Sequence, residues 1–250
     1  MNDKEKMYLP NIFQKFLQVL GTINHKCMMK ISRRGLEFIS IDDNNMCLAN
    51  AFISRKVFHK WKVFKESYAS INLDFLKKIF SSDTLIEEIK QNNESEIEIF
   101  VKKPLEMFLL IQSRLEYENV NTQIKHIIGG ATFFEATLPS KDLMILLKKI
   151  RQACDEISFY INNGKILCLA NFLNFSVLKT LTGDVTTVKF KNLKFSIPMK
   201  YFSAILPALS LSSKLKISLT EQGVMKALLL LNGGKYKLSL FISSRIEHDE

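Results

Sequence analysis

The sequence lacks the short motifs that mark the common enzyme classes. It contains no phosphate-binding loop of the Walker A type, no HExxH zinc helix and no GxSxG nucleophile turn. No carboxylates are paired at motif spacing. The adjacent Asp42 and Asp43 are interpreted as turn residues, because no histidine accompanies them. We therefore expect a protein that is not an enzyme and that has no cofactor and no metal site.

Cysteines and long apolar runs are also scarce. The four cysteines are Cys27, Cys47, Cys154 and Cys168, and they form no CxxC pair, which favours free buried thiols over a zinc site or a disulfide framework. The first ten residues, MNDKEKMYLP, are charged, and the run ALLLL near the C-terminus is too short to cross a bilayer. We expect a soluble intracellular protein with no membrane partner.

Acidic residues are fewer than basic ones. Lysine and arginine number 35 against 25 acidic residues, a formal net charge of +10. A basic excess of this size favours a polyanionic partner, with nucleic acid first and an anionic membrane surface second. A membrane-surface or RNA-binding protein would need exposed aromatics, but most of the 19 phenylalanines lie at core-facing positions of the predicted helices and strands.

What is present is a repeated pattern of helix and hairpin. Four segments have helical apolar spacing, the third with Ser140 as its expected N-cap and the fourth interrupted by Pro207: residues 11–20, 74–80, 140–152 and 198–209. Each precedes a hairpin pattern whose polar turn lies near residue 34, 103, 163 or 222, about 60 to 70 residues apart. With 250 residues and 47% hydrophobic composition, we expect an α+β chain of two similar halves.

The stretch GLEFISIDDNNMCLAN (35–50) reads as a strand, a polar turn and a second strand. Its pattern from Ile41 to Leu48 resembles the corresponding turn of DNA sliding clamps of the proliferating cell nuclear antigen (PCNA) type. Three further segments match in order: LPSKDL (138–143), PALSLSSKLKISL (207–219) and FISSRIE (241–247), the last being similar to the family's closing L-A-P-K-I-E. The resemblance covers essentially the whole chain.

The resemblance implies the DNA clamp fold. This fold has an N-terminal domain at 1–116, an interdomain connector at 117–132 and a C-terminal domain at 133–250. Each domain has two helix-plus-strand repeats, the helices line a ring and the antiparallel sheets lie outside. The implied function is a polymerase processivity factor that encircles duplex DNA without reading its sequence. The implied partners are DNA polymerase, flap nuclease, ligase and clamp loader, which would bind through short peptide motifs.

Basic residues lie mostly on the polar faces of the four predicted helices, where a sliding ring needs them to attract phosphate. The predicted DNA-facing residues are Lys15, Lys77, Lys78, Lys141, Lys148, Lys149, Arg151 and Lys200. Lysine is also common on the solvent-exposed surfaces of helices. The prediction therefore depends on the occurrence of basic residues on all four predicted helices and not on any single lysine.

The resemblance also implies a groove for partner peptides, formed by the turn, the connector and the C-terminal strand. The matching positions are Ile41, Asn45, Met46 and Leu48 on the turn, Ile124, Ile127 and Ile128 on the connector, and Phe241, Ile242, Ser243 and Ser244 near the end. Ring closure would pair the edge strands expected at 107–115 and 171–181 of neighbouring subunits.

Three departures from the family pattern leave alternatives open. The family is usually acidic, whereas this chain is basic. The connector has Ile128 and Gly129 in place of the usual proline, and Ser243 and Ser244 replace Ala-Pro. A homotrimer is expected. The alternatives are a heterotrimeric or checkpoint-type clamp subunit, and a monomeric basic processivity factor that does not encircle DNA. The compartment would be the nucleus in a eukaryote and the cytoplasm or nucleoid in an archaeon.

Overall fold

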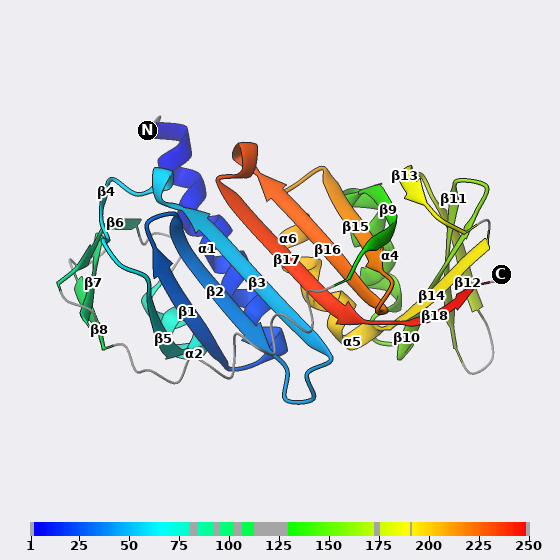
Figure 1. Ribbon diagram of the computed structural model, residues 1–250, viewed down its shortest axis with the longest axis horizontal. Coiled ribbons are helices and arrows are strands. Elements are labelled where there is room, and N and C mark those ends of the chain that lie inside the picture. The colour runs from blue at the N-terminus through cyan, green and yellow to red at the C-terminus, as the bar shows by residue number, and fades with distance from the viewer. Residues whose placement is uncertain are drawn as a thin grey trace. The chain divides into compact units, whose positions relative to one another are not determined.

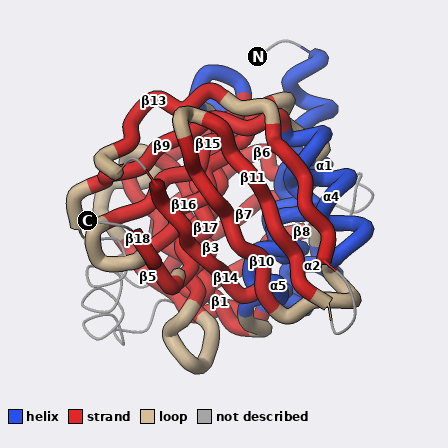
Figure 2. Tube along the Cα trace, turned by 90° about the vertical axis from the view of Figure 1, so that its right-hand side faces the viewer, coloured by secondary structure: helices blue, strands red, loops and turns tan. Residues whose placement is uncertain are grey.

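The computed structural model in Figure 1 describes residues 3–80, 85–92, 96–102, 107–112, 130–172, 176–190 and 192–248. Strands predominate over helices in these residues (Figure 2). None of the described helices is long and apolar enough to cross a membrane.

The chain divides into two compact units, each of which takes in a short piece of the other half of the sequence. Unit 1 comprises Met1–Asp43, Ala49–Gln123 and Leu230–Leu238, and unit 2 comprises Asn44–Leu48, Ile124–Leu229 and Ser239–Glu250. The domain limits expected at 1–116 and 133–250 stay a prediction. Most of the connector expected at 117–132 lies outside the described residues.

The described residues of unit 1 form two helices and the strands of two sheets. Its elements are α1 (Asp3–Ile23), β1 (Lys26–Ser32), β2 (Gly35–Ile41), β3 (Cys47–Ser54), the 3-10 turn η1 (Arg55–Val57), β4 (Lys60–Lys62), β5 (Ser67–Asn72), α2 (Leu73–Ile79), β6 (Leu85–Gln91), β7 (Glu96–Lys102) and β8 (Met107–Gln112). The order β3-β2-β1-β5 forms one sheet and β4-β6-β7-β8 the other. Helix α1 lies across one face of the first sheet, where Phe13 contacts Phe38 of β2 (Figure 1).

Unit 2 repeats this plan. Its elements are β9 (Thr132–Pro139), α4 (Ser140–Ile150), β10 (Glu156–Asn162), β11 (Lys165–Asn171), β12 (Ser176–Leu181), β13 (Asp184–Val188), β14 (Asn192–Pro198), α5 (Met199–Phe202), η2 (Ser203–Ile205), α6 (Leu206–Leu209), β15 (Lys214–Thr220), β16 (Val224–Leu231), β17 (Tyr236–Ser243) and β18 (Arg245–His248). The end of β16, the 3-10 turn η3 (Asn232–Gly234) and the start of β17 fall within the stretch Leu230–Leu238 that belongs to unit 1. One sheet has the order β13-β9-β15-β16-β17 and the other β12-β11-β10-β14-β18. Phe159 of β10 stacks on Phe195 of β14 and meets Phe202 of α5 edge-on.

The four predicted hairpins are confirmed. They are the antiparallel pairs β1–β2, β7–β8, β10–β11 and β15–β16. The fourth predicted helix is broken into α5, η2 and α6, and Pro207 lies in the first turn of α6, where its missing N–H is not needed. Ser140 was wrongly predicted as an N-cap. Pro139 holds that position, and the Ser140 N–H donates to the Ser213 carbonyl oxygen at 2.9 Å.

Candidate nucleic-acid interface and peptide groove

Helix α4 of unit 2 separates an apolar face from a basic one. Leu143, Leu146, Leu147 and Ile150 are buried, which fixes the helix on the sheet. Lys141, Lys148, Lys149 and Arg151 are all exposed. None of these four side chains forms an ion pair within the described part of the chain. The helix therefore presents several positive charges that can pair with phosphate.

Lys200 adds a further positive charge to unit 2. It is exposed on α5, and its Nζ lies 4.4 Å from the ring centroid of Tyr201. This cation–π interaction holds the ammonium group close to the helix surface.

In unit 1 the predicted basic residues are less available. Lys15 is half-buried on α1, and Lys78 is exposed on α2. The Nζ of Lys77 lies 3.3 Å from Asp74 Oδ1 and so close to Gly21 of α1 that a Cβ there would collide with it. Helices α1 and α2 pack together, and Lys77 covers their contact.

Asp74 also lies on this surface, and it was not among the residues predicted from the sequence. Its Oδ2 lies 3.2 Å from His25 Nδ1, and the hydrogen bond from Lys77, followed by that from His25, lowers the pKa of the Asp74 carboxyl. The spacing of Asp74 and Lys77, three residues apart on a helix, was the available signal. The carboxylate offsets one of the positive charges that unit 1 would offer to DNA.

The predicted groove residues on the turn are only partly exposed. Met46 has 41% of its surface exposed, whereas Leu48 is fully buried. Asn45 is exposed and has a positive φ of 56°, as expected for a turn asparagine. Ile41 is half-buried, and its carbonyl oxygen accepts a 2.9 Å hydrogen bond from Asn24 Nδ2. Leu48 can support a groove from beneath but cannot form its open floor.

The C-terminal positions lie beside this turn in unit 2. The N–H of Ser243 donates to the Met46 carbonyl oxygen at 2.9 Å, and Ser244 N–H donates to Gly223 at 2.7 Å. Ile242 is fully buried, and Phe241 is buried with Lys226 Nζ 5.3 Å from its ring centroid. Ile124, Ile127 and Ile128 lie outside the described residues. Of the predicted groove, the structure thus brings together Met46 and Ser243.

The turn has an anchor that was not predicted. Asn24, which follows α1, donates from Nδ2 both to Ile41 and, at 3.1 Å, to Asp43 Oδ1. No short-range sequence signal links residues so far apart. The interaction holds the start of the turn to the end of α1.

Strands β8 and β12 end their sheets in the described part of the chain. The expectation of edge strands within 107–115 and 171–181 is therefore confirmed where those segments are described. An edge strand offers unpaired backbone N–H and C=O groups to another chain.

The thiols offer no chemistry to this surface. All four cysteines are free and buried, as expected, and burial raises the pKa of both Cys27 and Cys168 to about 12. Groups of three or more metal-ligating side chains do not occur among the described residues.

Comparisons with known proteins identify the fold. No protein-family model matches the sequence. The chain is 21% identical over 223 residues to proliferating cell nuclear antigen 2 of Plasmodium falciparum, covering 83% of each chain. Its structure is similar to that of PCNA from Entamoeba histolytica, with a TM-score of 0.76 and 17% identity over 94% of this chain and 96% of that one. It is also similar to a chain of the PCNA2–PCNA3 complex from Sulfolobus tokodaii, with a TM-score of 0.74, 15% identity and the same coverage.

These relatives confirm the resemblance and the α+β fold class. The four helix-and-hairpin repeats and the two structural matches lead to the same assignment. The chain has the fold of PCNA-type clamps.

Proposed function

We propose that this protein is a non-catalytic sliding clamp that forms a three-subunit ring around duplex DNA and tethers replication and repair enzymes to it. The observation that carries the proposal is the basic face of α4, where Lys141, Lys148, Lys149 and Arg151 are exposed without ion pairs in the described structure. Charges on a helix surface with no geometry for reading base edges suit a protein that must attract phosphate yet slide.

Ring closure would join β8 of one subunit to β12 of the next. Both end their sheets in the part of the chain that the structure describes, and pairing them would remove two exposed edges at each junction. A ring of three identical chains is the simplest assembly. A heterotrimer, including a checkpoint-type assembly, is the alternative, and the Sulfolobus tokodaii neighbour is titled as a complex of two different PCNA chains.

Partner enzymes would dock beside Met46 and Ser243. The exposed thioether of Met46 adapts to different apolar side chains, and the turn is tied to the C-terminal strand by the Ser243 hydrogen bond. DNA polymerase, flap nuclease, ligase and the clamp loader are the proposed partners. The site of action is intracellular, in the nucleus of a eukaryote or in the cytoplasm or nucleoid of an archaeon.

A second candidate function is supported by the net charge of +10. A monomeric processivity factor could hold DNA on a positive surface without encircling it. Its retention would be purely electrostatic and would fall steeply with salt.

One experiment separates the two functions without a clamp loader. The protein is threaded onto linear duplex DNA with biotinylated ends, the ends are blocked with streptavidin, and the DNA is washed in about 0.5 M salt, where screening acts over only about 4 Å. A ring stays bound until a restriction enzyme opens the DNA between the blocks. Loss of the protein in the wash, before any cut, would contradict encirclement and favour the electrostatic tether.

The assembly is tested by sedimentation equilibrium over a wide concentration range. A trimer that persists on dilution supports the self-closed ring. A persistent monomer would contradict the homotrimer and leave the heterotrimer and the monomeric tether.

A further inference from the structure

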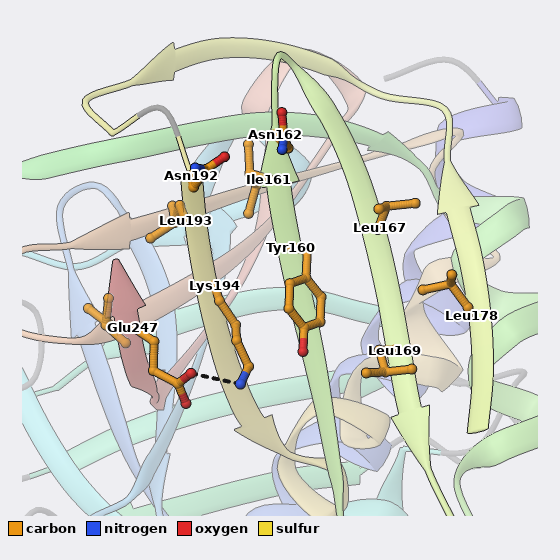
Figure 3. Close-up of a pocket in the computed structure, with 11 residues that line it drawn as sticks. Tyr160, Ile161, Asn162, Leu167, Leu169, Leu178, Asn192, Leu193, Lys194 and Glu247 are labelled. Atoms are coloured by element: carbon orange, nitrogen blue, oxygen red, sulfur yellow. Dashed lines mark hydrogen bonds and ion pairs between the residues drawn. The ribbon is translucent and has the colours of Figure 1, made fainter. Parts of the chain in front are cut away.

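One face of the five-stranded sheet in unit 2 is unusually apolar. Its core face, with Phe159 and Phe195, packs on the helices. The opposite face carries Tyr160, Leu167, Leu169 and Leu178, which project from neighbouring strands β10, β11 and β12 (Figure 3). These side chains and the ends of β14 and β18 line an open trough of about 970 Å³. Leu178 has 63% of its surface exposed.

The equivalent face in unit 1 is charged, so the fold does not require these leucines. Strand pairing relates the positions of the two sheets. In unit 1, Lys30 of β1 lies opposite Glu37 of β2 and Tyr68 of β5. In unit 2, Tyr160 holds the corresponding position on β10 and lies opposite Leu167 of β11 and Lys194 of β14. In unit 1 Lys30 Nζ also pairs with Glu66 at 2.9 Å. The solvated face of an antiparallel sheet is normally polar, so the leucines of unit 2 mark a surface that is covered by something else.

The size of the trough indicates what covers it. Eleven residues line it. A stable interface between two folded proteins takes about 20 to 30 residues on each side. The trough is therefore too small for a second copy of the chain. It fits a short segment that inserts a few apolar side chains.

The charge of the whole chain, more than the lining of the trough, favours an acidic segment, because the two charged residues of the lining, Lys194 and Glu247, form an ion pair with each other. Lys194 lies in its wall, with Nζ 2.7 Å from Glu247 Oε2 and 5.6 Å from the ring centroid of Tyr160. Asn162 is exposed at one end of the trough, where its side-chain amide can hydrogen-bond a peptide backbone. The net charge of +10 attracts acidic segments and repels basic ones.

We propose that this trough is a second docking site, separate from the Met46 groove. It takes a short acidic segment of a partner protein, with two or three aliphatic or aromatic side chains seated between Tyr160 and Leu178. Docking there is compatible with edge pairing of β12, because strand pairing uses the backbone while side chains stand perpendicular to the sheet. One ring subunit could therefore hold two segments at once.

The test uses random dodecapeptides displayed on phage. Peptides are selected on the wild-type protein and counter-selected on Leu178→Lys, which removes those that bind elsewhere, and survivors are measured as synthetic peptides by fluorescence polarisation. We expect survivors rich in Asp or Glu and in Leu or Phe. Leu178→Lys and Leu169→Lys should weaken their affinity by about tenfold or more. Leu230→Lys, a matched control at a leucine that is 53% exposed on β16, should leave it unchanged.

Two results would overturn the proposal. One is that no peptide distinguishes the wild type from Leu178→Lys, or that the survivors carry no acidic residues. The other is that the wild type self-associates through this face and Leu178→Lys abolishes it, since the occupant would then be a second copy. A variant counts as folded if its circular dichroism spectrum and melting temperature match those of the wild type. If Leu178→Lys is not folded by this criterion, Leu178→Ser takes its place.

Discussion

The backbone N–H of Ser243 donates a hydrogen bond to the carbonyl oxygen of Met46, with 2.9 Å between nitrogen and oxygen. These residues are almost two hundred positions apart in the chain, and the bond joins the polar turn between β2 and β3 to the end of β17. It leaves the Met46 side chain exposed. The turn thus has a fixed backbone and a free, adaptable apolar side chain, which is the combination that a peptide-binding surface needs.

Met46→Ala should weaken peptide binding without unfolding the protein. The probe is a fluorescein-labelled short peptide with two adjacent aromatic side chains, titrated by fluorescence polarisation. Losing the contact of one large apolar side chain should cost about 1 to 2 kcal/mol, or roughly five- to thirtyfold in Kd. Phe64→Ala, at an aromatic residue that is 50% exposed in unit 1, is the matched control. Equal weakening by both variants would mean that the peptide does not bind beside Met46.

Lys148→Glu should lower the affinity of the protein for duplex DNA and make that affinity less dependent on salt. The side chain is exposed on α4. Removing one phosphate contact should reduce the slope of log affinity against log salt by about one. Lys165→Glu makes the same charge change at an exposed lysine on strand β11 and should have a clearly smaller effect. If the two variants behave alike, net charge and not the helix face governs DNA binding.

Asp74→Asn should strengthen DNA binding, because it frees Lys77 and His25 from their carboxylate partner. The test is a double-mutant cycle: Asp74→Asn is measured by DNA titration in the wild type and in Lys77→Gln. The gain should be smaller in the Lys77→Gln background, since only the added net charge and the release of His25 remain. Equal gains in both backgrounds would show that the Asp74–Lys77 pair does not restrain Lys77.

The same pair predicts a pH dependence of stability. The folded-state pKa of Asp74 is lowered, so its stabilising contribution is fully present above the unfolded value near 3.8 and is lost as the pH falls through the lower folded value. The wild type should therefore melt above Asp74→Asn at pH 6, and the difference should shrink below pH 3.8. A difference that stays constant down to pH 2 would remove the pair as its cause.

Local patterns were sufficient to predict the hairpins but not which faces are covered. Alternation and turn residues located β1–β2 and β10–β11 correctly. In β11, however, Ile166, Leu167, Cys168 and Leu169 make both faces apolar, so the sequence alone could not separate the core face from the trough. Burial of a groove residue is set by strands that are distant in sequence. For this reason the sequence could not show that Leu48, one of the predicted groove positions, is buried.

Gly35→Ala should destabilise unit 1 far more than Gly164→Ala destabilises unit 2, although both glycines lie at the turn of the first hairpin of their unit. Gly35 has φ of +152°, and a Cβ there would lie 2.2 Å from the Ile53 carbonyl oxygen, which belongs to the backbone of β3 and cannot move aside freely. Gly164 has φ of +73° with nothing within 4 Å of the same position, so alanine there meets backbone strain alone, about 1 to 2 kcal/mol. The added collision at Gly35 should bring the loss in the free energy of unfolding to about 3 kcal/mol or more. Urea denaturation of the two variants measures both losses, and equal losses would mean that β2 and β3 shift apart without cost at Gly35.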